Sequence, residues 1–176
     1  MDLTKHEGFL AAVYTENGGD LVVRPLHHVE DEAVIQRIEN RDLYLGNWRA
    51  ADPAYHDQTF DYVLSPTSRE YPLTTHHCPL NDGPDNNWKA FEKAIDTART
   101  LYQQDGSLLI HCTAGISRSS TLIAATLAAE ENRQFLNALR IVQRSRPNAS
   151  PNPSLHEWAV IYLAAYGSTA GQEIHG

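Results

Sequence analysis

Cysteine and long apolar runs are both scarce in this chain of 176 residues, which contains only two cysteines. Two cysteines cannot build the disulfide framework of a small secreted domain, and they suit a reducing compartment. No apolar run approaches the ~20 residues that a membrane-spanning helix needs. The segment Met1–Glu7 lacks the basic and then apolar pattern of a signal peptide. We therefore expect a cytoplasmic protein.

Basic residues are also in short supply, because 14 lysines and arginines stand against 22 acidic residues, giving a formal net charge of −8. Nucleic acids and anionic membrane surfaces both bind proteins through a basic face. The charge balance therefore predicts that neither is a partner. An apolar content of 41% with 20% charged residues is ordinary for one globular domain of this length.

Metal-ligand spacing is missing as well, although the chain contains nine histidines. The pairs and clusters His27–His28 and His76–Cys78 consist of adjacent residues, without the gap of two to four residues that is usual for zinc. We interpret both as surface or structural residues. The sequence thus predicts no metal site and no cofactor.

One stretch carries most of the chemical information. The short apolar run Ser107–Ile110 is typical of a buried strand, and residues 121–129 are rich in helix formers. Between them stands His-Cys-Thr-Ala-Gly-Ile-Ser-Arg-Ser, residues 111–119. This order predicts a strand, a tight loop and a helix. The loop amides and the N-terminus of the helix can converge on one anion, and Gly115 allows backbone angles that a side chain would obstruct.

Such an anion site favours the reactive thiolate form of the cysteine at its centre, Cys112. Arg118 offers a planar fork for two oxygens of a bound oxyanion. Ser119, on the first turn of the helix, is placed to hydrogen-bond the sulfur, and we expect His111 to fix the loop through backbone hydrogen bonds. The alternative is a buried structural thiol, but five residue types at fixed spacing favour the reactive site. The predicted oxyanion-binding residues are Thr113, Ala114, Gly115, Ile116, Ser117 and Arg118.

Residues 111–121 resemble the dual-specificity branch of the cysteine-dependent protein tyrosine phosphatase superfamily. Residues 41–47, Asn81–Asp82 and 141–147, followed by Pro151–Asn152, are similar to further segments of that family. The resemblance covers about residues 41–167. It implies an α/β fold with a mainly parallel central sheet flanked by helices. We expect residues 1–40 to be an N-terminal extension packed on the catalytic domain, residues 41–167 to be that domain, and residues 168–176 to be a flexible tail.

The resemblance also implies a function: hydrolysis of phosphotyrosine, and of phosphoserine or phosphothreonine, through a phosphocysteine intermediate without a metal. Asp82 stands where the family carries its general acid. Asp85 is the alternative acid, although we expect it to cap the helix that begins near Trp88. The implied partner is a phosphorylated protein, and a monomer is expected.

Other readings remain open. The same loop serves phosphatases of RNA 5′-phosphates and of phosphoinositides, phosphate-binding modules, sulfur transferases and arsenate reductases. The acidic charge disfavours RNA, and a lysine at position 113 or 116 would have favoured phosphoinositides. Arg146 is placed either to contact a second phosphate or to satisfy carbonyl groups at a helix end. Cys78 is a candidate disulfide partner for Cys112, although a buried structural thiol is favoured.

The remaining patterns predict elements of secondary structure. Strands are expected at 21–23, 43–45, 60–66 and 76–80, and helices from Trp88 towards Gly106, at 135–142 and at 154–166. A further helix is expected at 32–38, capped by Asp31. The last helix is expected to turn Trp158, Ile161, Tyr162 and Ala165 inward.

Overall fold

The computed structural model describes residues 11–16, 20–25 and 30–166. Its central sheet has five strands in the order β3-β4-β7-β5-β6. These strands are β3 (Ile35–Arg37), β4 (Leu43–Gly46), β5 (Tyr62–Ser65), β6 (His76–His77) and β7 (Leu108–His111). Strands β4, β7, β5 and β6 run parallel, and β3 pairs antiparallel with β4. The predicted mainly parallel sheet is confirmed, as are the predicted strands that form it.

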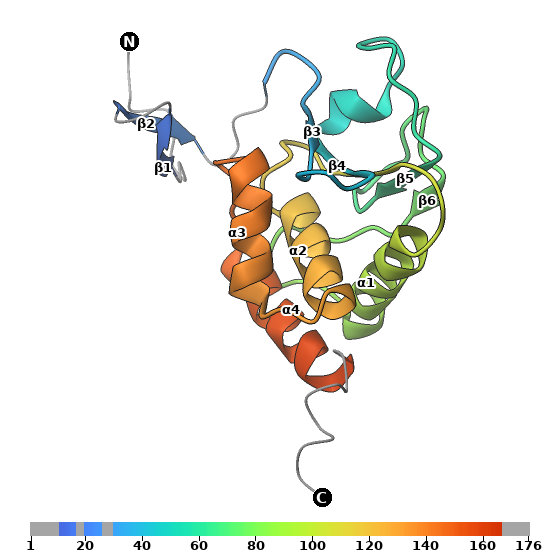
Figure 1. Cartoon of the computed structure of the whole chain (residues 1–176), viewed down its shortest axis with the longest axis vertical. Helices are drawn as coiled ribbons and strands as arrows, with labels where there is room; N and C mark the ends of the chain where they lie inside the picture. Colours follow the sequence, from blue (N-terminus) through green and yellow to red (C-terminus); the bar gives the residue numbers. More distant parts are fainter. Residues whose placement is uncertain (1–10, 17–19, 26–29, 167–176) are drawn as a thin grey trace, which may run out of the picture.

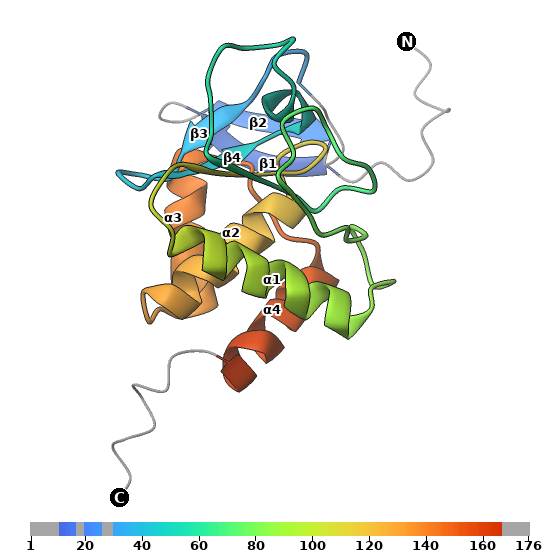
Figure 2. The same cartoon turned by 90° about the vertical axis from the view of Figure 1, so that its right-hand side faces the viewer.

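Four α-helices cover one face of this sheet, as Figures 1 and 2 show. They are α1 (Trp88–Tyr102), α2 (Arg118–Glu130), α3 (Phe135–Ser145) and α4 (Pro153–Tyr166), while a short 3-10 helix, η2 (Trp48–Ala51), packs against β4 and β7. Helix α2 is the central one and contacts α1, α3 and α4. Every residue of α2 from Ser119 to Ala129 is buried. An alanine-rich helix suits this place because its small side chains let neighbouring helices approach closely from all sides.

The alternation of side chains along the strands divides the core into two parts. Leu108 and Ile110 of β7 belong to the large cluster beneath the helices. Leu109 points to the opposite face and joins a smaller cluster with Ala50 and Ala51 of η2. Strand β7 is therefore buried on both faces, which explains its uninterrupted apolar sequence. This central strand leads directly into the loop that begins at Cys112.

The helix predicted at 32–38 is wrong. Residues 35–37 instead form strand β3 at the edge of the sheet, with Gln36 opposite Leu45 of β4. Asp31 accordingly does not cap a helix. The apolar residues in this segment fit a helical period, but the unpaired edge of β4 offered backbone hydrogen bonds that a helix of about two turns would not supply.

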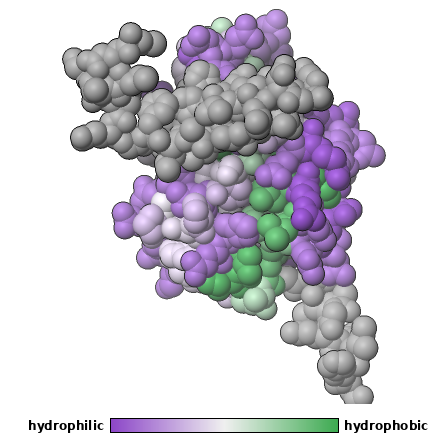
Figure 3. All heavy atoms as spheres, turned by 90° about the vertical axis from the view of Figure 1, so that its left-hand side faces the viewer, coloured by the Kyte–Doolittle hydropathy of each residue, from purple (hydrophilic) through white to green (hydrophobic). Residues whose placement is uncertain are grey.

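The inward face of α4 also differs from the prediction. Tyr162 is fully buried and Trp158 half-buried, but Ile161 is 49% exposed and Ala165 is also exposed. Because this helix is apolar on nearly every side, periodicity could not identify the buried face. Exposed apolar side chains contribute to a patch over α3 and α4 (Figure 3), and Leu136 and Val160 lie together there.

A separate antiparallel pair precedes the central sheet and consists of β1 (Ala11–Glu16) and β2 (Asp20–Pro25). It contains the strand predicted at 21–23. His27–His28 and the predicted tail at 168–176 lie outside the described residues, and the division at residue 40 stays a prediction. No helix in the described part of the chain is long and apolar enough to cross a membrane.

Candidate active site

The candidate site is the loop between β7 and α2, which we call the phosphate loop (residues 112–117). It lies at the carboxyl ends of the parallel strands, where α/β proteins bind ligands. The Cys112 amide donates to the Gly46 carbonyl at the end of β4 over 3.2 Å. Gly115 has a φ of +68°, and a Cβ there would lie 2.9 Å from the Gly46 oxygen. Glycine is required at 115 for both reasons, as the sequence predicted.

The carbonyl groups of the phosphate loop are bound on its outer side. They accept hydrogen bonds as follows: Thr113 from the Trp48 amide at 3.2 Å, Ala114 and Gly115 from Arg146 at 3.1 Å each, Ile116 from the Ser150 amide at 2.9 Å, and Ser117 from the Thr121 amide at 2.9 Å. The amides of Thr113–Ser117 donate to no group in the part of the chain that the structure describes. A loop with its carbonyls tied back and its amides unused can bind an oxyanion.

Cys112 stands at the start of this loop, and only 3% of its surface is exposed. Its Sγ lies 3.2 Å from Oγ of the fully buried Ser119, on the first turn of α2. A hydroxyl at that distance can donate a hydrogen bond to a thiolate and stabilise it. The structure thus brings Ser119 to the sulfur, as its position in the sequence predicted.

Arg118 is held beside the loop by three carbonyl or hydroxyl oxygens. Its Nη1 donates to Leu80 O at 3.1 Å and Pro66 O at 3.3 Å, and its Nη2 donates to Thr113 Oγ1 at 3.1 Å. A guanidinium has five N–H donors. The three bonds therefore leave Nε and one hydrogen of Nη2 for a ligand, while fixing the plane of the group.

His111 is completely buried and neutral at pH 7. Burial and the nearby Arg118 cation lower the pKa of His111 to about 4, against the opposing effect of the Cys112 carbonyl. Its Nδ1 donates to that carbonyl over 3.4 Å, so its Nε2 accepts from Ser65 Oγ at 2.6 Å. The Ser65 hydroxyl lies 2.7 Å from Thr74 Oγ1. His111 therefore bonds the backbone of the loop, as the sequence suggested, and its side chain also links the loop to β5.

Asp82 lies on the connection between β6 and α1 and touches the phosphate loop. Ser117 Oγ donates to Asp82 Oδ1 over 2.5 Å and accepts from the Asn152 amide at 2.8 Å. Asn152 Nδ2 also donates to the Asp82 carbonyl at 3.3 Å. Asp82 as a whole residue is exposed. The structure therefore brings Asp82 to the rim of the loop that Cys112 begins.

Asp85 does not cap α1, so that prediction is wrong. The cap is Asn87, whose side chain accepts from the Lys89 amide at 2.8 Å. The Asp85 carbonyl accepts from Asn81 Nδ2 at 2.6 Å, within the turn that carries Asp82. An asparagine directly before the first helical residue satisfies the orphan amides better than an aspartate two residues earlier.

The sequence left two roles open for Arg146. In the structure its side chain binds carbonyl groups. Its side chain is 8% exposed, and besides Ala114 and Gly115 it contacts the carboxylate of Glu30. These carbonyls belong to the phosphate loop rather than to the helix end that the sequence suggested. Glu30 was not singled out from the sequence, because no periodicity or motif marks it, and Asn47 was noted only as the last residue of the segment 41–47, without a role.

The contacts that Cys78 and the neighbouring His77 make are with residues outside the phosphate loop. Cys78 is buried in the main core with its Sγ 3.6 Å from Thr97 Oγ1 of α1, and His77 Nε2 binds the Thr67 carbonyl at 2.7 Å. Both cysteines are free thiols, and pairing of Cys78 with Cys112 stays a prediction. Within the described ranges, no group of three or more histidine, cysteine or acidic side chains could hold a metal ion.

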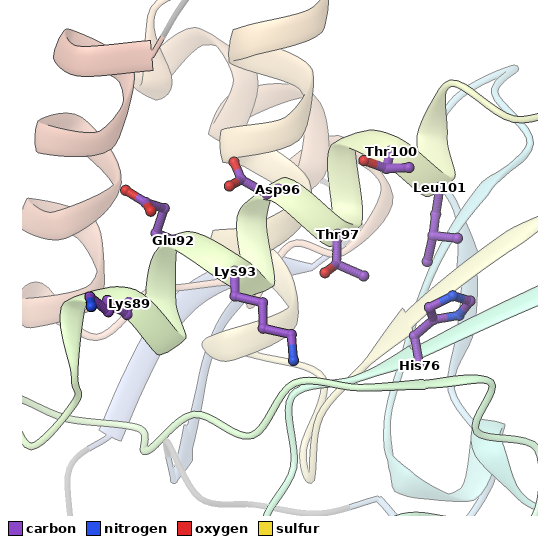
Figure 4. Close-up of a pocket in the computed structure, with 8 residues that line it drawn as sticks. All are labelled: His76, Lys89, Glu92, Lys93, Asp96, Thr97, Thr100 and Leu101. Atoms are coloured by element: carbon purple, nitrogen blue, oxygen red, sulfur yellow. The ribbon is translucent and has the colours of Figure 1, made fainter.

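A hollow of about 400 Å³ lies elsewhere, between α1 and β6 (Figure 4). Oppositely charged side chains of α1 line it together with His76. Lys89 and Lys93 alternate there with Glu92 and Asp96, so their charges largely compensate one another. The hollow contains no residue of the phosphate loop and is not the candidate active site.

Comparison with known proteins agrees with this geometry. Residues 43–163 match the family described as "Dual specificity phosphatase, catalytic domain". The chain is 29% identical over 165 residues to tyrosine-protein phosphatase yvh1 of Schizosaccharomyces pombe, covering 89% of this chain and 49% of that protein. It is 40% identical over 171 residues to MAP kinase phosphatase with leucine-rich repeats protein 3 of Dictyostelium discoideum, covering 89% of this chain and 20% of that protein. It spans half or less of the length of these two relatives.

Solved structures show the same fold. The crystal structure of human DUSP28 superimposes with a TM-score of 0.63 at 22% identity, covering 74% of this chain and 96% of that one. The crystal structure of DUSP15 gives a TM-score of 0.63 at 24% identity, covering 81% of this chain and 97% of that one.

Proposed function

The chain belongs to the dual specificity phosphatase catalytic-domain family, and we propose that it hydrolyses phosphotyrosine, phosphoserine and phosphothreonine in proteins through a phosphocysteine intermediate, without a metal. One observation carries the proposal. The phosphate loop that begins at Cys112 has its carbonyls bound and its amides without an acceptor among the described residues, and the Cys112 sulfur has a hydroxyl partner at 3.2 Å. A binding module needs the amides but has no use for a nucleophile and its partner.

In the first step, the Cys112 thiolate attacks phosphorus and forms an S–P bond while the P–O bond to the substrate oxygen breaks. That oxygen leaves with the bonding electron pair and takes a proton from Asp82. Asp82 Oδ1 accepts from Ser117, so the transferable proton sits on the other carboxyl oxygen, Oδ2. The loop amides and Arg118 bind the three equatorial oxygens while negative charge redistributes.

In the second step, water attacks the phosphocysteine, and Asp82, now a carboxylate, accepts a proton from that water. The S–P bond breaks, and the electron pair returns to sulfur. Ser119 donates to the departing thiolate, which lowers the cost of releasing it. Phosphate then leaves, and both groups are in their starting states.

A phosphorylated protein is the proposed substrate, acted on by a monomer in the cytoplasm, where Cys112 stays reduced. Thr113 and Ile116 place no lysine in the loop to bind further phosphates of an inositol headgroup. Arg146 is engaged with loop carbonyls and Glu30, so it is not presented to a second phosphate. The net charge of −8 opposes binding of RNA.

The test is turnover of a phosphotyrosine peptide in EDTA, beside a phosphothreonine peptide, a phosphoinositide and a 5′-triphosphorylated RNA. We expect turnover of the peptides, inhibition by vanadate, and little activity on the last two substrates. Cys112→Ser should abolish turnover but retain phosphate binding, whereas the matched variant Cys78→Ser should stay active. Activity that vanishes in EDTA and returns with a divalent ion would refute the metal-free mechanism. Preferential turnover of RNA or phosphoinositide would refute the substrate class.

A further inference from the structure

Residues 30–34 precede the matched family region at 43–163, yet they are tied to the end of β4 beside the phosphate loop. The side chain of Asn47 makes two of these ties, accepting from the Val34 amide at 3.0 Å and donating to the Glu32 carbonyl at 2.8 Å. Arg49 donates to the Glu30 carbonyl. The segment is therefore held in a defined place, and its first residue, Glu30, is directed at Arg146.

The carboxylate of Glu30 binds Arg146 in a fork-to-fork arrangement. Arg146 Nη1 lies 3.0 Å from Glu30 Oε1, and Nη2 lies 3.1 Å from Oε2. The Arg146 side chain is 8% exposed and the Glu30 side chain is 21% exposed. A bidentate pair shielded to this degree is stronger and more directional than an exposed ion pair.

Arg146 uses its other donors on the phosphate loop. Its Nε donates to Gly115 O and its Nη2 to Ala114 O, each over 3.1 Å. One guanidinium thus joins Glu30 to two consecutive carbonyls at the tip of the loop. Because the amide that follows each carbonyl belongs to the same peptide plane, holding Ala114 O and Gly115 O outward turns the amides of Gly115 and Ile116 inward.

We propose that Glu30 is a positioning residue of the active site, acting through Arg146 to keep the amides of the phosphate loop directed at the bound oxyanion. The proposal rests on the proposed function and extends it to a residue outside the matched catalytic domain. Without the carboxylate, Arg146 is a largely buried cation lacking its counter-charge, and it gains by turning towards solvent. The carbonyls of Ala114 and Gly115 then lose their donors, and the loop relaxes.

Geometry and charge predict opposite effects of removing this carboxylate. A negative charge near an anion site repels the anion, so neutralising Glu30 would tighten oxyanion binding if charge alone mattered. If Glu30 orients Arg146 and the loop, its neutralisation weakens binding instead. The sign of the change therefore decides between the two.

The experiment measures tungstate affinity by calorimetry with the full chain, because tungstate binding needs no turnover. We expect Glu30→Gln to weaken tungstate binding and lower kcat/KM by about tenfold each, the effect of losing one charge-assisted contact. Glu30→Asp, which keeps the charge, should recover part of the loss. In a background of Arg146→Met, adding Glu30→Gln should change tungstate affinity little, since the two act through one contact.

The matched control is Glu39→Gln, which breaks the exposed pair of Glu39 with Arg144 at 2.8 Å, two residues before Arg146. We expect this variant to keep wild-type tungstate affinity and kcat/KM. Unchanged or tighter tungstate binding by Glu30→Gln would overturn the proposal, as would additive losses in the double variant. A wild-type chain that binds tungstate but hydrolyses no phosphoester would refute the proposed function alone. Thermal unfolding of each variant shows whether a loss is local, and the Glu30→Asp variant decides the matter if Glu30→Gln does not fold.

Discussion

Mild acid, between pH 7.5 and pH 5, should destabilise this protein through His111. The pKa of His111 falls from an ordinary value of 6.5 to about 4 in the folded protein, chiefly because the ring is buried. Between those values the unfolded chain binds a proton that the folded chain does not. The free energy of unfolding therefore falls as the pH falls through this window, and the contribution is fully present above pH 6.5.

The magnitude follows from the two pKa values. Between pH 7.5 and pH 5, one group with these values lowers the free energy of unfolding by about 2 kcal/mol. Glu131 sets a lower pH limit for measuring the contribution of His111. Its hydrogen bonds with Arg41 lower the pKa of Glu131 to about 2 from 4.5, so its contribution is lost only at lower pH.

The assay is urea unfolding at several pH values between 7.5 and 5, for the wild type and for His111→Gln. Glutamine is neutral throughout, so the variant should lose about 2 kcal/mol less than the wild type over this range. The comparison cancels the other histidines, which are present in both proteins. If the free energy of unfolding depends on pH equally in the two proteins, the conclusion that His111 is neutral in the folded protein is refuted.

Three other outcomes are expected. Asp82→Asn should slow the hydrolysis of a phosphotyrosine peptide by about 100-fold but that of an activated aryl phosphate much less, because a good leaving group needs little protonation. Asp85→Asn should slow neither reaction. If steady-state kinetics show the reverse pattern, the acid is Asp85. Gly115→Ala should cost at least about 1 kcal/mol of stability in thermal unfolding and should lose phosphate binding. The φ of Gly115 is +68°, and an added Cβ would collide with the carbonyl oxygen of Gly46. An active, fully stable variant would contradict this. Asn87→Ala should cost about 1 kcal/mol through the lost cap of α1, whereas Asp85→Ala should leave the unfolding midpoint unchanged.

The local part of the candidate site could be predicted from the sequence. A strand, a glycine-containing loop and a helix follow one another within residues 107–130, so their order and spacing alone place Cys112, Ser119 and Arg118 around one loop. The 3.2 Å separation of the Cys112 and Ser119 side chains spans seven residues.

Secondary-structure elements whose formation or orientation depends on residues distant in the sequence could not be predicted from it. Strand β3 forms because β4 presents an open edge, and the apolar pattern of residues 32–38 contains no sign of that edge. The buried side of α4 follows from how it packs on α2, and an almost wholly apolar helix leaves its orientation undetermined by sequence. The cap of α1 depended on where its first turn begins, which patterns locate only to within a few residues.

The positions of Asp82 and Glu30 show the same limit at the site itself. Asp82 comes to the rim of the loop through Ser117, 35 residues away, and Glu30 reaches Arg146 across 116 residues. Sequence determined which residues could do chemistry, because composition and short-range spacing select local backbone structure. Tertiary structure alone decided which of them meet, because a contact between distant residues depends on the path of all the chain between them.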